Sequence, residues 1–161
     1  MSNLDLLKKL IKIESISPND NGCFDVIKQQ FEGLDFSFEE TNYKNISNLV
    51  ITNGNSKNKT FCFLGHTDVV PPGPESEWTV PPFSGEIIDN KIYGRGAADM
   101  KGGVACFISA LKEFLSEYKD PSFNIMVLLN SNEEGKLENG KVDRVINEMI
   151  DKDKFIDFCL I

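Results

Sequence analysis

Apolar residues near the start of the chain recur at intervals of three and four over Leu4–Ile11. This spacing is typical of an amphipathic helix with one face turned towards a core. Ser2 or Asn3 can cap the helix at its amino end, and we expect it to reach about Ile13. The segment SPNDNG, residues 17–22, would then end it, because proline and glycine interrupt a helix.

The rest of the chain alternates helical spacing with short apolar runs. Two runs, KTFCFLG at 59–65 and FNIMVLLN at 123–130, are typical of strands covered on both faces. Further expected elements are strands over 36–40, 48–52 and 155–161, helices over 23–34, 102–118 and 142–150, a turn over 53–59, and a hairpin over 84–94 that turns at Asp89-Asn90. This order predicts the α/β class, with a mixed sheet flanked by helices and no linker that divides the chain.

Composition excludes several classes of function. The chain has 25 acidic and 17 basic residues, so its charge of −8 disfavours a nucleic-acid partner. No apolar run approaches the roughly 20 residues of a membrane span, and the first residues lack the pattern of a signal peptide. Three of the four cysteines sit in apolar runs, as buried thiols of a reducing compartment do. We therefore expect a cytoplasmic protein without nucleic-acid or membrane partners.

Imidazole and carboxylate groups gather where the predicted buried strands end. His66 and Asp68 follow the strand at 59–65, Glu133 and Glu134 follow the strand at 123–130, and Asp99 precedes the helix at 102–118. Ligands of open α/β sheets bind at the carboxyl ends of the strands. Asp68 could accept one N–H of the His66 ring, so that the other ring nitrogen faces a metal. One of two adjacent glutamates could bind a cation while the other moves protons.

Each of these residues also has an ordinary structural interpretation. A lone histidine is commonly structural, Asp99 could cap the helix that follows it, and the two glutamates could be solvated loop charges. Three such groups at three element ends together favour a functional site. Other sites fit the sequence poorly: YGRGAAD at 93–99 lacks the third glycine of a dinucleotide loop, and one histidine excludes a HExxH zinc motif. The sequence also has no GxSxG nucleophile elbow.

Three blocks of sequence resemble the family of co-catalytic zinc metallopeptidases and aminoacylases. They are GHTD at 65–68, GRGAADMKG at 94–102 and NEEG at 132–135. The segment SPNDNGC at 17–23 is similar to the desuccinylase branch of that family. The resemblance implies a zinc-dependent amide hydrolase that acts on a small N-acyl amino acid.

The resemblance also implies a role for each candidate residue. His66 would bind one zinc ion, Asp99 would bridge two, and Glu134 would bind the second. Glu133 would be the general base, and Asp68 would orient His66. A complete site would hold two Zn²⁺, with Co²⁺ as a substitute, and full-length members of the family form homodimers.

The same resemblance leads us to expect a partial catalytic domain over residues 1–161. Family members continue into a Gly-Glu-Pro segment, a second metal-binding histidine and a lid domain. We therefore expect little or no activity from this chain alone, and an open sheet edge with an uncovered apolar face. Two alternatives stay open: a related aminoacylase or dipeptidase, and a non-catalytic remnant.

Overall fold

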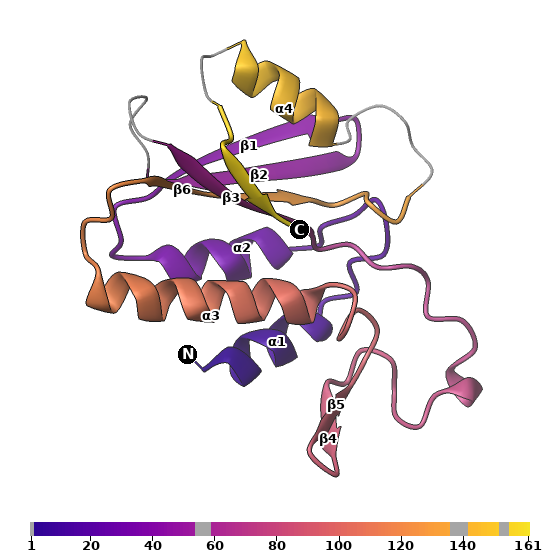
Figure 1. The fold of residues 1–161 in the computed structure, drawn as a ribbon. Coiled ribbons are helices and arrows are strands. Elements are labelled where there is room, and N and C mark those ends of the chain that lie inside the picture. Colours follow the sequence, from indigo (N-terminus) through magenta and orange to yellow (C-terminus); the bar gives the residue numbers. More distant parts are fainter. Residues whose placement is uncertain (1, 54–58, 136–141, 152–154) are drawn as a thin grey trace.

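The computed structural model describes residues 2–53, 59–135, 142–151 and 155–161, and a mixed sheet of five strands forms its centre (Figure 1). The strands lie in the order β1-β2-β6-β3-β7. Their bounds are β1 Ser37–Tyr43, β2 Ile46–Thr52, β3 Thr60–His66, β6 Asn124–Asn130 and β7 Phe158–Leu160. β1 and β2 form an antiparallel pair, β2 is antiparallel to β6, and β6, β3 and β7 are mutually parallel neighbours. The predicted α/β class with a mixed sheet is confirmed.

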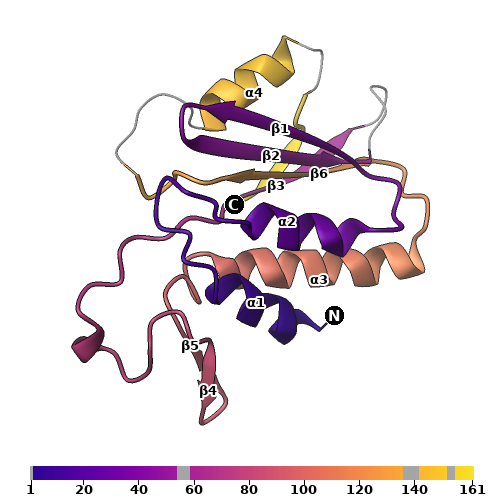
Figure 2. The same cartoon turned by 180° about the vertical axis from the view of Figure 1, so that it is seen from behind.

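Helices cover both faces of this sheet. Helices α1, α2 and α3 lie on one face, and α4 lies on the other (Figures 1 and 2). Their bounds are α1 Asn3–Ile11, α2 Cys23–Lys28, α3 Lys101–Glu117 and α4 Val142–Ile150. Two 3-10 turns, Gln29–Phe31 and Glu75–Glu77, and a separate hairpin of β4 Glu86–Ile88 with β5 Lys91–Tyr93 complete the described elements.

The core divides into two apolar clusters because successive residues of a strand point to opposite faces. Leu49 and Ile51 of β2 pack with α1, α2 and α3, whereas Val50 between them joins the cluster beneath α4. Ile125 and Met126 of β6 divide in the same way. This double coverage explains why the buried strands are continuously apolar.

Most predicted elements are present, with shifted ends. Ser2 caps α1 through a reciprocal pair of hydrogen bonds with Asp5, but Leu4 is 43% exposed and Leu6 takes its place in the core. The hairpin turns at Asp89-Asn90, which both have positive φ angles of 48° and 59°. The prediction of one helix over 23–34 was wrong in extent: α2 ends at Lys28, and Gln29–Phe31 is a single 3-10 turn.

Both β1 and β2 are longer than predicted because they pair with each other along their full length. The strand predicted over 155–161 is shorter, since only Phe158–Leu160 pairs with β3. The predicted turn over 53–59 falls mostly on residues outside the described part of the chain.

The prediction of three buried cysteines needs a correction. All four cysteines are free thiols, but only Cys23 and Cys62 are buried, whereas Cys106 and Cys159 are exposed. Cys106 lies on the outer side of α3, and Cys159 lies on the edge strand β7, so an apolar neighbourhood in the sequence did not place either in the core. Along the described residues, no helix is long and apolar enough to cross a membrane.

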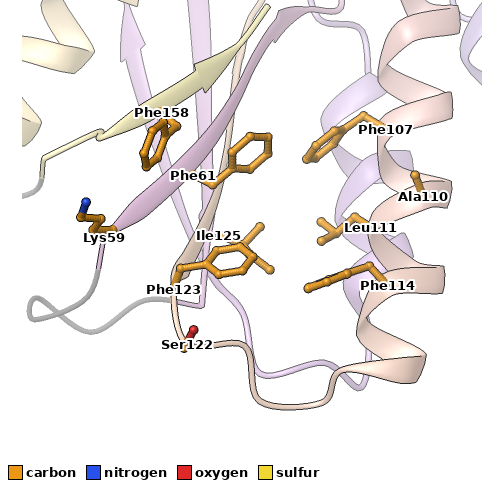
Figure 3. A pocket seen from close by; sticks show the side chains of 10 residues that line it. All are labelled: Lys59, Phe61, Phe107, Ala110, Leu111, Phe114, Ser122, Phe123, Ile125 and Phe158. Atoms are coloured by element: carbon orange, nitrogen blue, oxygen red, sulfur yellow. The ribbon is translucent and has the colours of Figure 1, made fainter.

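Strand β7 leaves the expected apolar surface at the edge of the described sheet. Phe158, Leu160 and Ile161 are 58%, 48% and 81% exposed. Beside this strand lies a cavity of about 600 Å³, in which aromatic side chains of β3 and β7 face those of α3 (Figure 3). Phe61 and Phe107 stack there with ring centroids 6.4 Å apart. The lining residues include no carboxylate or imidazole, so the cavity lacks the chemistry of the candidate site.

Candidate metal centre

His66 is the last residue of β3 and lies at the carboxyl edge of the sheet. Its imidazole is 5% exposed, and its Nε2 atom lies 3.0 Å from Oδ1 of Asp99 and 3.9 Å from Oε2 of Glu133. Its Nδ1 atom lies 2.9 Å from the backbone carbonyl oxygen of Asp68 and 3.5 Å from that residue's carboxylate. The Nδ1 atom thus faces Asp68 as predicted, but its partner at hydrogen-bond distance is the backbone carbonyl rather than the carboxylate. The Nε2 atom is turned towards the other acidic groups.

Asp99 reaches His66 because α3 begins directly under the end of β3. The backbone N–H of His66 donates to Sδ of Met100 at 3.3 Å. A Cβ atom on Gly65 would lie 3.1 Å from Cε of the same methionine, so a larger residue would require the Met100 side chain to shift. The Asp99 side chain itself is 74% exposed and points into the open space at the sheet edge.

Asp68 is fully buried and joins the two loops of the site. Its Oδ1 atom accepts the backbone N–H of Glu133 at 3.1 Å, and its Oδ2 atom accepts that of Glu134 at 3.2 Å. The hydroxyl of Ser17 also donates to Oδ2. Asp68 therefore holds the backbone of the two glutamates as well as contacting His66, a larger role than the sequence predicted.

The two glutamates follow β6, which pairs with β3 in parallel so that Asn130 lies opposite His66. The Asn130 side chain accepts the N–H of Asn132 at 2.7 Å and turns the chain back over the sheet edge. A Cβ atom on Gly135 would lie 1.9 Å from the Asn132 side chain. A larger residue at position 135 would therefore have to displace the Asn132 side chain.

Among the residues that the structure describes, one group of side chains is close enough to hold a metal ion. Ligand atoms of His66, Glu133 and Glu134 all lie within 4.8 Å of one another. Asp99 contacts His66 at the same Nε2 atom that faces Glu133, but it is not one of these three residues. The structure thus brings all five predicted site residues to one edge of the sheet. A cleft of about 510 Å³ opens there, and His66, Asp99 and Glu133 line it.

The concentrated charge changes the protonation of these groups. Burial alone would lower the pKa of His66, but the hydrogen bonds and charge of Asp68, with a hydrogen bond to Asp99, raise it from 6.5 to about 9. Burial would raise the pKa of Asp68, but the nearby His66 imidazole and hydrogen bonds from Ser17 and the Glu133 amide hold it below its ordinary value. Burial and then the charge of Asp99 raise the pKa of Glu134. The acidic groups around His66 thus favour the protonated form of its imidazole when no metal is bound.

Sequence reasoning missed the residues that support the site from behind. The segment 17–22 was interpreted as a helix break, yet Ser17 contacts Asp68 and Asp20 accepts the hydroxyl of Thr67 at 3.0 Å. Asn130 was assigned only as the end of a strand. The one sequence signal for these contacts is that small polar residues are frequent in the segment 17–22 and directly after the buried strand that ends at Asn130.

Parallel strands that deliver an imidazole and carboxylates to one edge define an α/β domain of the metallohydrolase class. The chain belongs to peptidase family M20/M25/M40, whose model matches residues 62–161. Membership of this metallopeptidase family implies a divalent metal, and the cluster of His66, Glu133 and Glu134 fits one.

Several curated relatives match this chain over almost all of its residues. Succinyl-diaminopimelate desuccinylase of Psychromonas ingrahamii is 44% identical over 158 residues, which cover 98% of this chain and 41% of that protein. The enzyme of the same name from Rhodospirillum centenum is 44% identical over 161 residues, with 97% and 41% covered. The chain therefore spans about two fifths of the length of these relatives.

Solved structures share the fold. The M20 family metallo-carboxypeptidase Sso-CP2 of Sulfolobus solfataricus matches with a TM-score of 0.82 and 25% identity, over 99% of this chain and 37% of that one. Human carnosine dipeptidase 1 matches with a TM-score of 0.80 and 23% identity, over 98% and 37%. Each match again covers less than half of the longer chain.

Proposed function

We propose that residues 1–161 form the amino-terminal part of the catalytic domain of a zinc-dependent amide hydrolase. The proposed reaction is the hydrolysis of N-succinyl-LL-2,6-diaminopimelate to succinate and LL-2,6-diaminopimelate, a step of lysine biosynthesis. The observation that carries this proposal is the cluster of His66, Glu133 and Glu134, whose imidazole and carboxylate atoms lie within 4.8 Å of one another. It lies in a chain 44% identical to proteins named for that reaction.

The donor set suits zinc, which binds imidazole nitrogen and carboxylate oxygen. His66 would bind one ion through Nε2, Asp99 would bridge two ions, and Glu134 would bind the second; Co²⁺ could replace zinc. When bound, zinc supplies Lewis acidity, which polarises the scissile carbonyl and makes water a stronger acid.

The chain's own residues would then move the proton and hold the geometry. Glu133, whose side chain is 64% exposed in the cleft, would take a proton from the attacking water and pass it to the leaving amine. Asp68 would keep the Nδ1 side of His66 occupied, so that Nε2 stays turned to the ligand position.

We further propose that this chain contains only part of the site. Three protein ligands, one of them shared between two ions, fall short of the three or four that each zinc normally takes. The other ligands, the substrate-gripping lid and the surface for homodimers would belong to the part of the longer relatives that this chain does not span. The chain alone would bind at most one zinc ion tightly and hydrolyse little or no substrate.

The free thiols of the four cysteines support a further proposal, that the protein is located in the cytoplasm.

A chimera tests the proposed reaction. Residues 1–161 would be joined to the remaining part of the Psychromonas ingrahamii relative, loaded with zinc, and assayed on a panel of N-succinyl, N-acetyl and dipeptide substrates. We expect hydrolysis of N-succinyl-LL-2,6-diaminopimelate, lost on Glu133→Gln while zinc stays bound. Preference for another N-acyl amino acid or a dipeptide would favour the related aminoacylase or dipeptidase instead. A folded, zinc-loaded chimera that hydrolyses nothing would favour a non-catalytic remnant.

A further inference from the structure

The segment Ser15–Asp20 runs along the back of the candidate site and is attached to the loop that follows β3. Ile16 and Val69 form an isolated parallel bridge. The Val69 N–H donates to the Ser15 carbonyl at 2.9 Å, and the Ser17 N–H donates to the Val69 carbonyl at 3.1 Å. The course of the segment is therefore fixed by the backbone on both sides of Ser17.

The segment is also attached to the loop that follows β6. The hydroxyl of Ser131 donates to the carbonyl of Pro18 at 2.7 Å. The backbone N–H of Ser47 in turn donates to the Ser131 hydroxyl at 2.9 Å, which fixes this residue against β2. The loops of β3 and β6 that carry the candidate ligands are thus joined through a third piece of chain.

Ser17 provides the side-chain contact at the centre of this arrangement. Its hydroxyl donates to Oδ2 of Asp68, the same oxygen that accepts the backbone N–H of Glu134. Asp68 is fully buried, so its orientation depends on the donors around it. If the Ser17 hydroxyl is removed, the Asp68 carboxylate loses a hydrogen-bond donor to Oδ2. The carboxylate is then less firmly oriented as the acceptor of the Glu133 and Glu134 backbone N–H groups.

We propose that Ser17 is a positioning residue of the metal centre, acting through Asp68 on the backbone of Glu133 and Glu134. It would not contact metal or substrate. The inference rests on the proposed function in one respect, namely that the two glutamates serve a metal-dependent reaction. The positioning of their backbone can be measured without metal.

The main alternative is that Ser17 merely stabilises the fold. Ser15 offers a matched control, because its fully buried hydroxyl donates to the Thr67 carbonyl at 2.7 Å in the same two pieces of chain. Ser15→Ala removes a hydrogen bond from the same region but leaves the donors of the Asp68 carboxylate in place. Ser17→Thr keeps a hydroxyl at position 17 and serves as the conservative rescue.

The experiment measures amide hydrogen exchange and chemical shifts at Glu133 and Glu134 in the metal-free chain by NMR. In Ser17→Ala we expect exchange at both amides to become about tenfold faster, the equivalent of roughly one hydrogen bond to a charged group. We expect Ser17→Thr to restore slow exchange, and Ser15→Ala to lower stability without altering these two amides. Unchanged amides in Ser17→Ala, or equal changes in Ser15→Ala, would overturn the inference.

Titration with Co²⁺ adds a second measurement. We expect Ser17→Ala to weaken binding about tenfold, the size seen when a group supporting a metal ligand is removed. If the wild-type chain binds no Co²⁺ or Zn²⁺ while the two amides still respond to Ser17→Ala, the metal proposal fails and the positioning role stands. If metal binds equally well to both forms and the amides do not respond, the positioning role fails alone.

Discussion

Nε2 of His66 lies 3.0 Å from Oδ1 of Asp99, although 33 positions separate the two residues in the sequence. The first ends a buried strand and the second precedes α3, and Met100 packs between these elements. Without metal the pair is a histidine held by a carboxylate. A metal ion bound by both side chains would replace the proton that His66 Nε2 and Asp99 Oδ1 share in the metal-free chain.

That relationship predicts opposite pH trends for stability and metal affinity. The folded pKa of His66, about 9, lies above its ordinary value of 6.5. Because protonated His66 is favoured in the folded state, it contributes its full stabilisation below about pH 6.5. This contribution disappears as the pH rises to about 9. The loss would be at most about 3 kcal/mol. Metal affinity should rise over the same interval, because the ligating imidazole must be neutral.

Urea unfolding of the metal-free chain between pH 6 and 9.5 checks this trend. His66 is the only histidine, so His66→Gln supplies a clean control. The wild-type midpoint should fall across the interval, whereas the midpoint of the variant should stay nearly flat. Parallel curves for the two proteins would contradict the assigned protonation of His66.

Two adjacent glycines at the start of α3 should respond oppositely to alanine. A Cβ atom on Gly102 would lie 2.2 Å from the carbonyl oxygen of Ala97, whereas one on Gly103 would meet only Cε of Met100, at 3.8 Å. We expect Gly102→Ala to destabilise the chain by about 1–3 kcal/mol. Gly103→Ala should be neutral or stabilise it by up to about 1 kcal/mol, because alanine favours helix.

Thermal unfolding with Co²⁺ titration measures both effects. Because Gly102 lies next to the turn that carries Asp99, we also expect Gly102→Ala to weaken metal binding while Gly103→Ala does not. Equal stability of the two variants would show that α3 can shift freely relative to Ala97.

The buried side chain of Lys101 should be essential for the packing of α1 on α3. Its Nζ atom is fully buried and donates to the carbonyls of Leu10 and Ile13, 2.8 Å away in each case, at the end of α1. Burial lowers the pKa of this lysine, and the nearby acidic groups oppose the change. Lys101→Met would leave these carbonyls without their donor, and we expect a loss of roughly 2 kcal/mol.

Chemical unfolding of Lys101→Met, with Lys9→Met as the control, tests this role. Lys9 lies on the exposed side of α1, so its replacement should change the free energy of unfolding by less than about 0.5 kcal/mol. Equal free energies of unfolding for the two variants would show that the carbonyls find other donors.

The sequence allowed the site residues to be predicted better than the contacts that hold them. His66 and Glu133 were found because apolar strands visibly end beside them, and parallel strands place such ends at one edge of a sheet. The partner of His66 Nδ1 was not predictable, because the choice between the backbone carbonyl and the carboxylate of Asp68 depends on ångström-scale packing.

Local patterns also failed where long-range contacts decide the outcome. Ser17 sits in a segment whose proline and glycine indicate only a break, and its contact with Asp68 spans 51 positions. The extent of β1 depends on pairing with β2, which continues beyond the apolar residues that marked each strand. Cys159 sits in an apolar run, but its strand lies at the edge of the described sheet and is exposed.

The central claim is that His66 and Glu134 bind a metal ion beside Glu133, and calorimetric titration with Zn²⁺ tests it most directly. The wild-type chain should bind one ion, with affinity reduced at least about 100-fold in His66→Gln and in Glu134→Gln. Glu86→Gln, which alters an exposed carboxylate on β4, should bind like the wild type. Equal affinity in all four proteins, or two tight ions per wild-type chain, would contradict the account.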